Sequence, residues 1–463
     1  MKILIENLGV LRKAQFELSD LTIICGHNNT GKTYATYAVF GFLSNWHRLM
    51  RAEVSDTEIS QLISDGVIRI DITSYIMNSQ NILSEGCRRY SEQLHTIFAS
   101  SSKSFTNTNF QVELESDLSS AFAASFERKL RSQQSELLML SKSEGSDVLE
   151  VSLSTEGEKI KLPSSIIEDV ISEAIIEIIF GNYFPSPFIA SAERTGVSIF
   201  IKELDFARNR LVHEIGRAEK EIDNQDMFLD SYSDYALPVR ANLDFTRRLG
   251  EIAKEESFIA QKHPHILDKF ADIIGGEFLS GTNKSIYFKP RDNGITLTMG
   301  ESSGVVRSML DVGFYLRHIA KPGDLLMVDE PELSLHPENQ CKVACLFAWL
   351  VNLGIQVFIT THSDYIIREF NTLIMLYQEE PFLKQIATRE GYSCEELIDK
   401  KLVKAYVAER DKRQPKHHTT RNINHTLIAA DISYEQGIDA RSFDKTIVRM
   451  NEIQEAILWR DGE

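Results

Sequence analysis

Apolar and polar positions alternate over the first 25 residues in the way that paired β-strands do. The pattern predicts three strands, at residues 2–6, 14–18 and 21–25. The third run is almost continuously apolar, which is typical of a strand buried on both faces of a sheet. Gly26 interrupts it, and residues 32–43 then predict a helix.

A second α/β pattern lies in the C-terminal half of the chain. It predicts a helix, a strand, a helix and a strand, at residues 308–320, 325–329, 338–353 and 356–360. Shorter strands are expected just before it, at 285–289 and 294–299. Alternation of this kind is typical of a parallel sheet flanked by helices. We therefore predict an α/β fold with an antiparallel N-terminal edge, a large helical insertion and a helical C-terminal appendage.

The remaining segments are more polar and predict helices rather than strands. The stretches with helical spacing are 56–68, 118–140, 197–271 and 443–458. We divide the chain accordingly into a first lobe of the α/β part (1–50), an inserted, mostly helical module (51–185), a helical arm (186–295), a second lobe (296–375) and a C-terminal appendage (376–463).

Composition narrows the class of protein. A chain of 463 residues exceeds what one hydrophobic core usually serves. The apolar run that comes nearest to a membrane span, 170–184, is interrupted by Glu173 and Glu177, so no membrane span is expected. No stretch near the N-terminus has the pattern of a signal peptide, which favours the cytoplasm. A net charge of −17 argues against a surface that binds nucleic acid over a wide area, so any contact with nucleic acid would be local.

The five cysteines do not form a metal pattern. They are scattered without Cys-x-x-Cys spacing. Cys341 and Cys345 lie one helical turn apart, but no His or Cys pair follows at zinc-like spacing. We interpret these two residues as small buried hydrophobic groups.

A complete phosphate-loop motif follows the apolar strand at 21–25. It consists of Gly26, His27, Asn28, Asn29, Thr30, Gly31, Lys32 and Thr33. In this motif, backbone N–H groups surround the phosphates and the following helix adds its positive N-terminal end. Lys32 is expected to reach the β- and γ-phosphates, and the hydroxyl of Thr33 to bind Mg²⁺.

Two adjacent acidic residues stand at the carboxyl end of the strand predicted at 325–329. Because ligands of parallel α/β sheets bind at the carboxyl ends of strands, Asp329 and Glu330 are expected beside the phosphate loop. Asp329 can hold Mg²⁺ through water, and Glu330 can polarise the attacking water. The next strand ends at His362, which we expect to contact the γ-phosphate.

The phosphate loop, the acidic pair and the strand that leads to His362 together resemble the ABC-ATPase heads of the SMC, RecF and OLD families. The resemblance extends to the segment 333–337, at the D-loop position, and to 301–304, at the place of the signature motif. It implies that Ser303 and Gly304 bind the γ-phosphate on a second subunit. Val305 stands where that motif usually has a second glycine, and we identify no Q-loop glutamine.

A narrower resemblance concerns the segment 192–196 and the following Phe200, Glu203 and Leu204. It is similar to a segment of compact ATPases of bacterial anti-phage systems: the Septu subunit PtuA and the ATPases of PARIS and Gabija. Arg194 would then lie near the nucleotide or a dimer interface, the alternative being a surface salt bridge. Such ATPases carry a TOPRIM nuclease or recruit an effector. Since no Asp-x-Asp pair follows His362, we expect the nuclease to be another chain.

Two further features leave alternatives open. Arg208 and His213 fit the R-N-x-x-x-H pattern of HEPN ribonucleases, which would make the chain an RNase in its own right. A basic loop spans 400–421 and is expected to be solvated or to contact a protein or nucleic acid. Its positive residues include Lys412, Arg413, Lys416, His417, His418 and Arg421.

The resemblance implies an ATPase that uses ATP and Mg²⁺ and forms a homodimer or a higher homo-oligomer. Such a protein would regulate or scaffold a separate effector, a nuclease, in anti-phage defence. Turnover is expected to be slow because two subunits must complete each site. The alternatives are the HEPN-like RNase and a DNA-repair ATPase of the RecF type.

Overall fold

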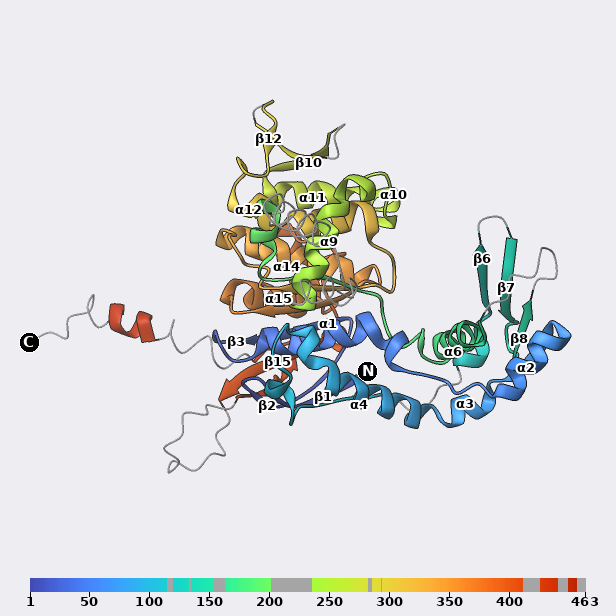
Figure 1. Cartoon of the computed structure of the whole chain (residues 1–463). Coiled ribbons are helices and arrows are strands. Elements are labelled where there is room, and N and C mark those ends of the chain that lie inside the picture. Colours follow the sequence, from blue (N-terminus) through green and yellow to red (C-terminus); the bar gives the residue numbers. More distant parts are fainter. Residues whose placement is uncertain are drawn as a thin grey trace, which may run out of the picture. The chain divides into compact units, whose positions relative to one another are not determined.

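The computed structural model describes residues 1–114, 120–132, 135–153, 163–200, 235–281, 285–292, 294–410, 425–439 and 449–455 (Figure 1). The chain divides into two compact units. The first comprises Met1–Leu4, Phe42–Gln93 and Asn109–Pro185, and the second comprises Ile5–Gly41, Leu94–Thr108 and Ser186–Glu463.

A large sheet forms the centre of the second unit, which confirms the predicted α/β class. From β1 on, its strands lie in the order β1-β2-β16-β15-β3-β14-β13-β9. Their bounds are β1 (Lys2–Leu8), β2 (Leu11–Glu17), β3 (Leu21–Gly26), β9 (Pro187–Ala190), β13 (Leu325–Asp329), β14 (Gln356–Thr361), β15 (Val403–Arg410) and β16 (His425–Ala429). Strands β9, β13, β14, β3 and β15 run parallel to one another, whereas β16 is antiparallel to β15.

The sheet is buried on both faces, as the apolar runs predict. On one face, Leu21, Ile23 and Cys25 belong to a hydrophobic core that continues into the helices α11 (Pro264–Ile274), α14 (Pro337–Asn352) and α15 (Asp364–Leu376). On the other face, the ring of Phe16 lies 6.3 Å from that of Phe358. Because alternate residues of a strand point to opposite faces, a strand such as β3 has to be apolar throughout.

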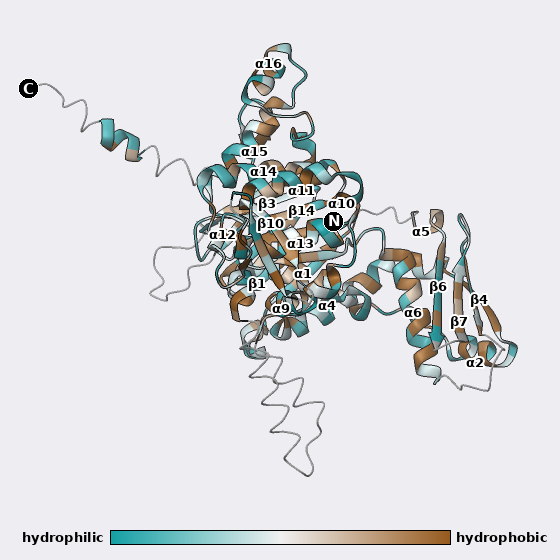
Figure 2. Cartoon of the chain, turned by 90° about the horizontal axis from the view of Figure 1, so that it is seen from above, coloured by the Kyte–Doolittle hydropathy of each residue, from teal (hydrophilic) through white to brown (hydrophobic). Residues whose placement is uncertain are grey.

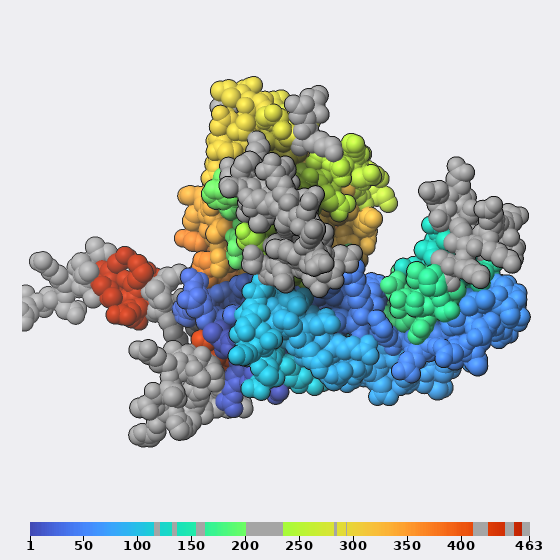
Figure 3. Space-filling view, viewed as in Figure 1, coloured from blue at the N-terminus to red at the C-terminus, as the bar shows by residue number. Residues whose placement is uncertain are grey.

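The remaining elements of the second unit are helices and two small sheets. The helices are α1 (Lys32–Leu49), of which the first part belongs to this unit, η1 (Ser102–Phe105), α9 (Leu237–Ile252), α10 (Phe258–Lys262), α11 (Pro264–Ile274), α12 (Gly304–Ser308), α13 (Leu310–Phe314), η2 (Tyr315–Ile319), α14 (Pro337–Asn352), α15 (Asp364–Leu376), α16 (Pro381–Glu390) and η3 (Lys400–Leu402). One small sheet consists of β10 (Gly276–Ser280), β11 (Ile286–Pro290) and β12 (Leu297–Thr298), and this sheet is yellow in Figure 3. The other consists of β17 (Ile432–Ser433) and β18 (Gly437–Ile438).

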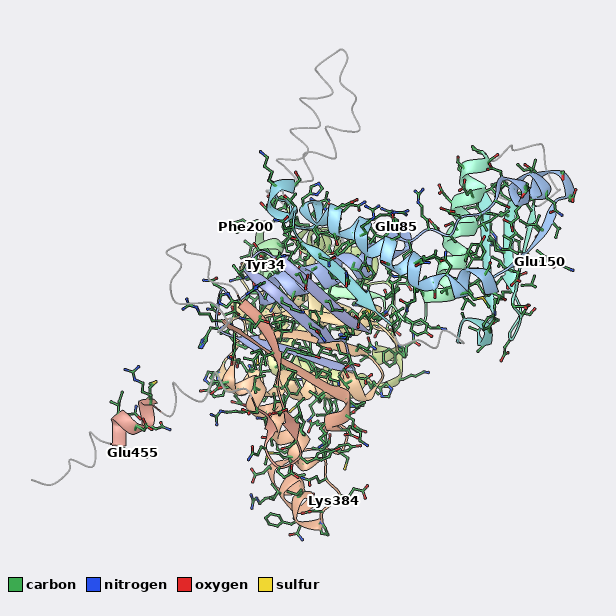
Figure 4. All side chains as sticks on the ribbon, turned by 90° about the horizontal axis from the view of Figure 1, so that it is seen from below. Tyr34, Glu85, Glu150, Phe200, Lys384 and Glu455 are labelled. Atoms are coloured by element: carbon green, nitrogen blue, oxygen red, sulfur yellow. The ribbon has the colours of Figure 1, made fainter. Side chains whose placement is uncertain are left out.

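Two predictions for this unit were wrong. The segment after 375 is not a helical appendage, because β15 lies in the sheet between β3 and β16. The helix expected at 308–320 is instead α12, α13 and the π-helical turn η2. The helices α11, α14 and α15 complete the core, and α16 with Lys384 projects from it (Figure 4).

The first unit is mixed rather than mostly helical, which corrects the prediction for 51–185. Its antiparallel sheet has the order β4-β8-β7-β6. The elements of this unit are α2 (Asp56–Asp65), β4 (Val67–Asp71), α3 (Thr73–Met77), most of α4 (Ser79–Ile97), β5 (Asn109–Glu113), α5 (Ser120–Ala123), β6 (Phe126–Ser132), β7 (Ser135–Lys142), β8 (Val148–Leu153) and α6 (Ser164–Phe180). Figure 2 shows α6 largely in the colour of hydrophobic residues.

Of the described part of the helix expected at 118–140, only α5 (Ser120–Ala123) is helical, and from Phe126 on the described chain is a β-hairpin of β6 and β7. Leu138 and Leu140 are buried on one face of the sheet, as are Leu149 and Val151 of β8. Cross-strand packing therefore outweighs the helix propensity of the leucines and charged residues in this segment. Among the helices of the described ranges, none is long and apolar enough to cross a membrane.

Several sequence predictions concern residues that lie wholly or partly outside the described ranges. Arg208 and His213 lie outside them, as do Lys412 to Arg421 of the basic loop. Of the helix expected at 443–458, residues 449–455 are described and are helical. Cys341 and Cys345 are half-buried rather than buried.

Candidate functional site

The phosphate loop connects β3 to α1, in the position that its motif requires. Residues 27–31 form the turn between the strand and the helix. Gly31 has a φ of +96°, and a Cβ there would lie 2.5 Å from Cγ of Leu11. Both the backbone angle and the close approach therefore demand glycine. The hydroxyl of Thr30 donates to the carbonyl oxygen of His27 at 2.8 Å, which closes the turn.

Lys32 folds back into this loop. Its Nζ donates to the carbonyl oxygens of Gly26 at 3.0 Å and of His27 at 2.9 Å, and only 5% of the residue is exposed. Burial lowers the pKa of Lys32, while the nearby carboxylates of Glu330 and Asp329 act in the opposite direction. The positive ammonium group therefore lies near the loop carbonyls and near two carboxylates that favour its charge.

Asp329 ends β13 and is fully buried. The register of the sheet pairs it with Thr360 on β14, whose hydroxyl donates to Oδ1 of Asp329. Burial raises the pKa of Asp329 to about 6, and the hydroxyls of Thr360 and Thr33 lower it. The second oxygen, Oδ2, is buried and has no hydrogen-bond partner among the described residues.

Glu330 and His362 face each other at the ends of β13 and β14. Nδ1 of His362 lies 3.6 Å from Oε1 of Glu330 and 3.1 Å from Oε1 of Glu332. The nearby carboxylate of Glu330 raises the pKa of His362, and the imidazole of His362 lowers the pKa of Glu330. Both side chains are partly exposed, at 40% for His362 and 27% for Glu330, so both remain within reach of a ligand.

A cavity of about 620 Å³ lies between the phosphate loop and Glu330. It is lined by Val10, Asn28, Asn29, Thr30, Gly31, Lys32, Thr33, Tyr34 and Glu330. Tyr34, labelled in Figure 4, stands at the start of α1 and stacks on Phe98 at 5.2 Å. A space of this size with backbone N–H groups and a buried lysine at its wall suits a phosphate chain.

The residues beside this cavity also fit a divalent cation. Oδ2 of Asp329 is a buried carboxylate oxygen without a partner in the described chain, and the hydroxyl of Thr33 is close enough to lower the pKa of Asp329. No cluster of three or more His, Cys, Asp or Glu in the described ranges could hold a metal alone. Mg²⁺ typically takes one or two protein ligands and completes its shell with phosphates and water. Asp329 and Thr33 could hold it in that way.

The segment expected to be the signature lies apart from this cavity. Ser303 is exposed and caps α12, and its hydroxyl accepts a hydrogen bond from N of Val306 at 3.4 Å. A Cβ on Gly304 would lie 3.1 Å from Oγ of Ser334, so Gly304 and the D-loop position pack together. Neither Ser303 nor Gly304 lines the cavity at the phosphate loop.

Sequence reasoning missed several residues that organise the site. Glu332 accepts hydrogen bonds from Oγ1 of Thr361 at 2.9 Å and from N of His362 at 2.7 Å. The sequence did contain a signal for these contacts, because the polar residues Thr360 and Thr361 stand at the end of an otherwise apolar strand. Arg194 is neither at the surface nor in an exposed salt bridge, because only 1% of it is exposed.

Comparisons with known proteins agree with this geometry at the level of the family. Residues 1–367 match the family AAA_15, described as an AAA ATPase domain. A search of curated proteins finds no match. Solved structures that match include an SMC head bound to the C-terminal winged-helix domain of ScpA, with 12% identity, a TM-score of 0.34, and coverage of 92% of this chain and 97% of that one.

Two further solved structures are of the same kind. The SMC head domain from Thermotoga maritima has 10% identity and a TM-score of 0.30, with 93% and 98% of the two chains covered. The SMC head from Pyrococcus furiosus, bound to the C-terminal domain of ScpA, has 14% identity and a TM-score of 0.32, with 98% of each chain covered. TM-scores this low establish neither activity nor partners here. The family match covers most of the chain and coincides with the phosphate loop and the acidic strand, and the protein accordingly belongs to the AAA_15 family of ATPases.

Proposed function

We propose that this ATPase works as a nucleotide-driven dimer of the ABC type. Each ATP would be held by the phosphate loop of one copy and by Ser303 and Gly304 of a second copy. The observation that supports this most directly is the composition of the cavity. It is lined by the phosphate loop and Glu330 but by neither Ser303 nor Gly304, although Ser303 is exposed. A second copy can therefore bring that segment to the open phosphate site.

The chemistry within one copy follows from the positions of its side chains. Lys32 would move from the carbonyl oxygens of Gly26 and His27 to the β- and γ-phosphates, since a phosphate oxygen is the stronger acceptor. Mg²⁺, held by Thr33 and, through water, by Asp329, would neutralise charge on the phosphates. Glu330 would orient and deprotonate the attacking water, and His362 would hold Glu330 and contact the γ-phosphate.

The experiment that tests the shared site mixes two inactive variants. Ser303→Arg should bind ATP but neither dimerise nor hydrolyse, since a long cationic side chain blocks the interface. Lys32→Ala should not bind ATP tightly. A mixed dimer would contain one site with an intact phosphate loop and an intact Ser303, so partial ATPase activity should return on mixing. Ser100→Arg, at an exposed position elsewhere on the second unit, is the matched control and should behave like the wild type.

Two outcomes would contradict the shared site. Full activity of Ser303→Arg alone would remove the signature assignment. A mixture without activity, although mixed dimers form, would mean that both sites fire together or that the sites are not shared.

We further propose that the dimer controls a separate nuclease in anti-phage defence, in the cytoplasm. The resemblance of the segment 192–196 to anti-phage ATPases supports this. The test is phage plating on cells that carry the gene with its neighbours, with Lys32→Ala as the variant. Protection that persists in that variant would reject an ATP-dependent role in defence.

A further inference from the structure

Arg194 is the largest fully buried side chain of the described residues, and it binds only backbone carbonyl groups. It follows β9 and begins the helical stretch that leads to Phe200, which is labelled in Figure 4. Its guanidinium donates four hydrogen bonds. The acceptors are the carbonyl oxygens of Ser308 at 2.7 Å, Ser191 at 2.8 Å, Asp329 at 2.7 Å and Glu330 at 2.9 Å.

Two of these four bonds fix the backbone of Glu330. The carbonyl of Asp329 belongs to the peptide plane before Cα of Glu330, and the carbonyl of Glu330 belongs to the plane after it. Arg194 bonds both, and N of Glu330 also donates to the carbonyl oxygen of Thr360 at 3.0 Å. Holding both planes fixes φ and ψ of Glu330, and these two angles set the direction of the Cα–Cβ bond from which its side chain starts.

The backbone of Glu330 needs such support. Its φ is +53°, in the left-handed region that residues with a Cβ adopt only at a cost. A strained conformation persists only where the surroundings hold it, and such residues cluster at functional sites. At Glu330 the surroundings are the guanidinium of Arg194 on one side and β14 on the other.

The remaining two bonds connect this backbone to other elements. Ser191 follows the last residue of β9, and Ser308 is the last residue of α12, the helix that Ser303 caps. One side chain thus joins the end of β9, the end of α12 and the peptides of the acidic pair. Arginine suits this place because its rigid fork carries five N–H donors, whereas a lysine ammonium has three.

The positive charge of Arg194 is balanced inside the protein. Burial lowers the pKa of Arg194, and the carboxylate of Asp311 opposes this most strongly, followed by those of Asp329 and Glu332. Asp311 is itself buried, with 3% of the residue exposed. A buried cation with hydrogen bonds and nearby carboxylates can remain charged.

We propose that Arg194 is a positioning residue for ATP hydrolysis, which holds the backbone of Glu330 so that its carboxylate points at the attacking water, and which ties the end of α12 to that backbone. This inference rests on the proposed role of Glu330 as the base. ATP binding through the phosphate loop does not depend on it, because Arg194 contacts no residue of the loop among its four acceptors.

The test separates positioning from a merely structural role. Arg194→Lys keeps the charge but can satisfy at most three of the four carbonyls, and Arg194→Gln removes the buried charge and keeps two donors. Both variants should bind ATP with a dissociation constant within about twofold of the wild type. The kcat per bound ATP should fall at least about tenfold, as expected when a base is held in the wrong direction.

Asn242 provides the matched control. It is 1% exposed and also supports the end of β9, where its amide donates to the carbonyl oxygen of Ile189 at 2.6 Å and accepts from N of Ser191 at 3.0 Å. It does not bond Asp329 or Glu330. Asn242→Leu should lower the thermal midpoint as Arg194→Lys does, but its kcat per bound ATP should stay within about twofold of the wild type.

A double variant gives the second readout. If Arg194 acts through Glu330, adding Arg194→Lys to Glu330→Gln should change the residual rate by less than about twofold, because both changes affect the same step. The proposal would be overturned if the double variant lost activity by the product of the two single-variant factors. It would also be overturned by wild-type kcat in both Arg194 variants, or by an equal loss of kcat in Asn242→Leu. Normal hydrolysis by Glu330→Gln alone would instead reject Glu330 as the base, whatever Arg194 does.

Discussion

The exchange of Glu330 for Gln removes a base while leaving its surroundings nearly unchanged. Glutamine has the same shape and can adopt the same backbone angles, and the hydrogen bonds of Arg194 to the carbonyls are independent of the side chain. The exchange does remove the ion pair with His362, which joins two partly exposed groups at 3.6 Å. Such pairs contribute about 0–1 kcal/mol to stability. The variant should therefore fold.

The kinetic effect should be much larger than the effect on stability. Loss of a general base slows a reaction by about 10² to 10⁴-fold. At 1.36 kcal/mol per factor of ten, this raises the barrier by about 2.7 to 5.4 kcal/mol. ATP should still bind, since Lys32 and the phosphate loop are intact. With hydrolysis blocked, the dimer should persist for as long as ATP is bound.

The assay has three parts: ATP binding at equilibrium, single-turnover hydrolysis, and mass by light scattering with and without ATP. Glu338→Gln is the matched control, because Glu338 is 69% exposed and pairs with Lys342, one turn along α14. The control should behave like the wild type. Normal turnover by Glu330→Gln would refute the base, and an unchanged mass with ATP would refute the dimer.

Two further changes test the phosphate loop and the metal site. Lys32→Ala, which removes the ammonium group now bonded to Gly26 and His27, should weaken ATP binding by about 10 to 100-fold, the effect of a charged hydrogen bond, and an unchanged dissociation constant would reject the assignment of the loop. Asp329→Asn should abolish Mg²⁺-dependent hydrolysis, yet without Mg²⁺ it should stabilise the fold above pH ~6 by on the order of 3 kcal/mol, because burial raises the pKa of Asp329 from 3.8 to about 6. The sign follows from the raised pKa of an acid: the charged form destabilises the folded state, so the gain in the variant should vanish as the pH falls towards ~4. Denaturant unfolding at several pH values measures this, and a gain that grows on acidification would contradict it.

Local patterns alone determined the chemistry-bearing part of this protein. The phosphate loop, the two apolar strands that end at Asp329 and just before His362, and the helix that connects these two strands were predicted within a few residues of their observed bounds. The reason is physical. A strand buried on both faces has to be apolar throughout, and a loop that must bring backbone N–H groups round phosphates has to have glycine at fixed places.

Tertiary structure decided what depends on partners distant in sequence. Strand β15 reads as part of a peripheral segment, yet it pairs with β3 across more than 370 residues, which no local pattern encodes. The hairpin of β6 and β7 has helical composition and becomes a sheet only because β8 pairs with it. For Arg194 the sequence left open a place near the nucleotide or a dimer interface and a surface salt bridge. Only the convergence of β9, α12 and β13 surrounds it with four carbonyl groups, and a buried cation has to satisfy its donors with whatever acceptors the fold brings together.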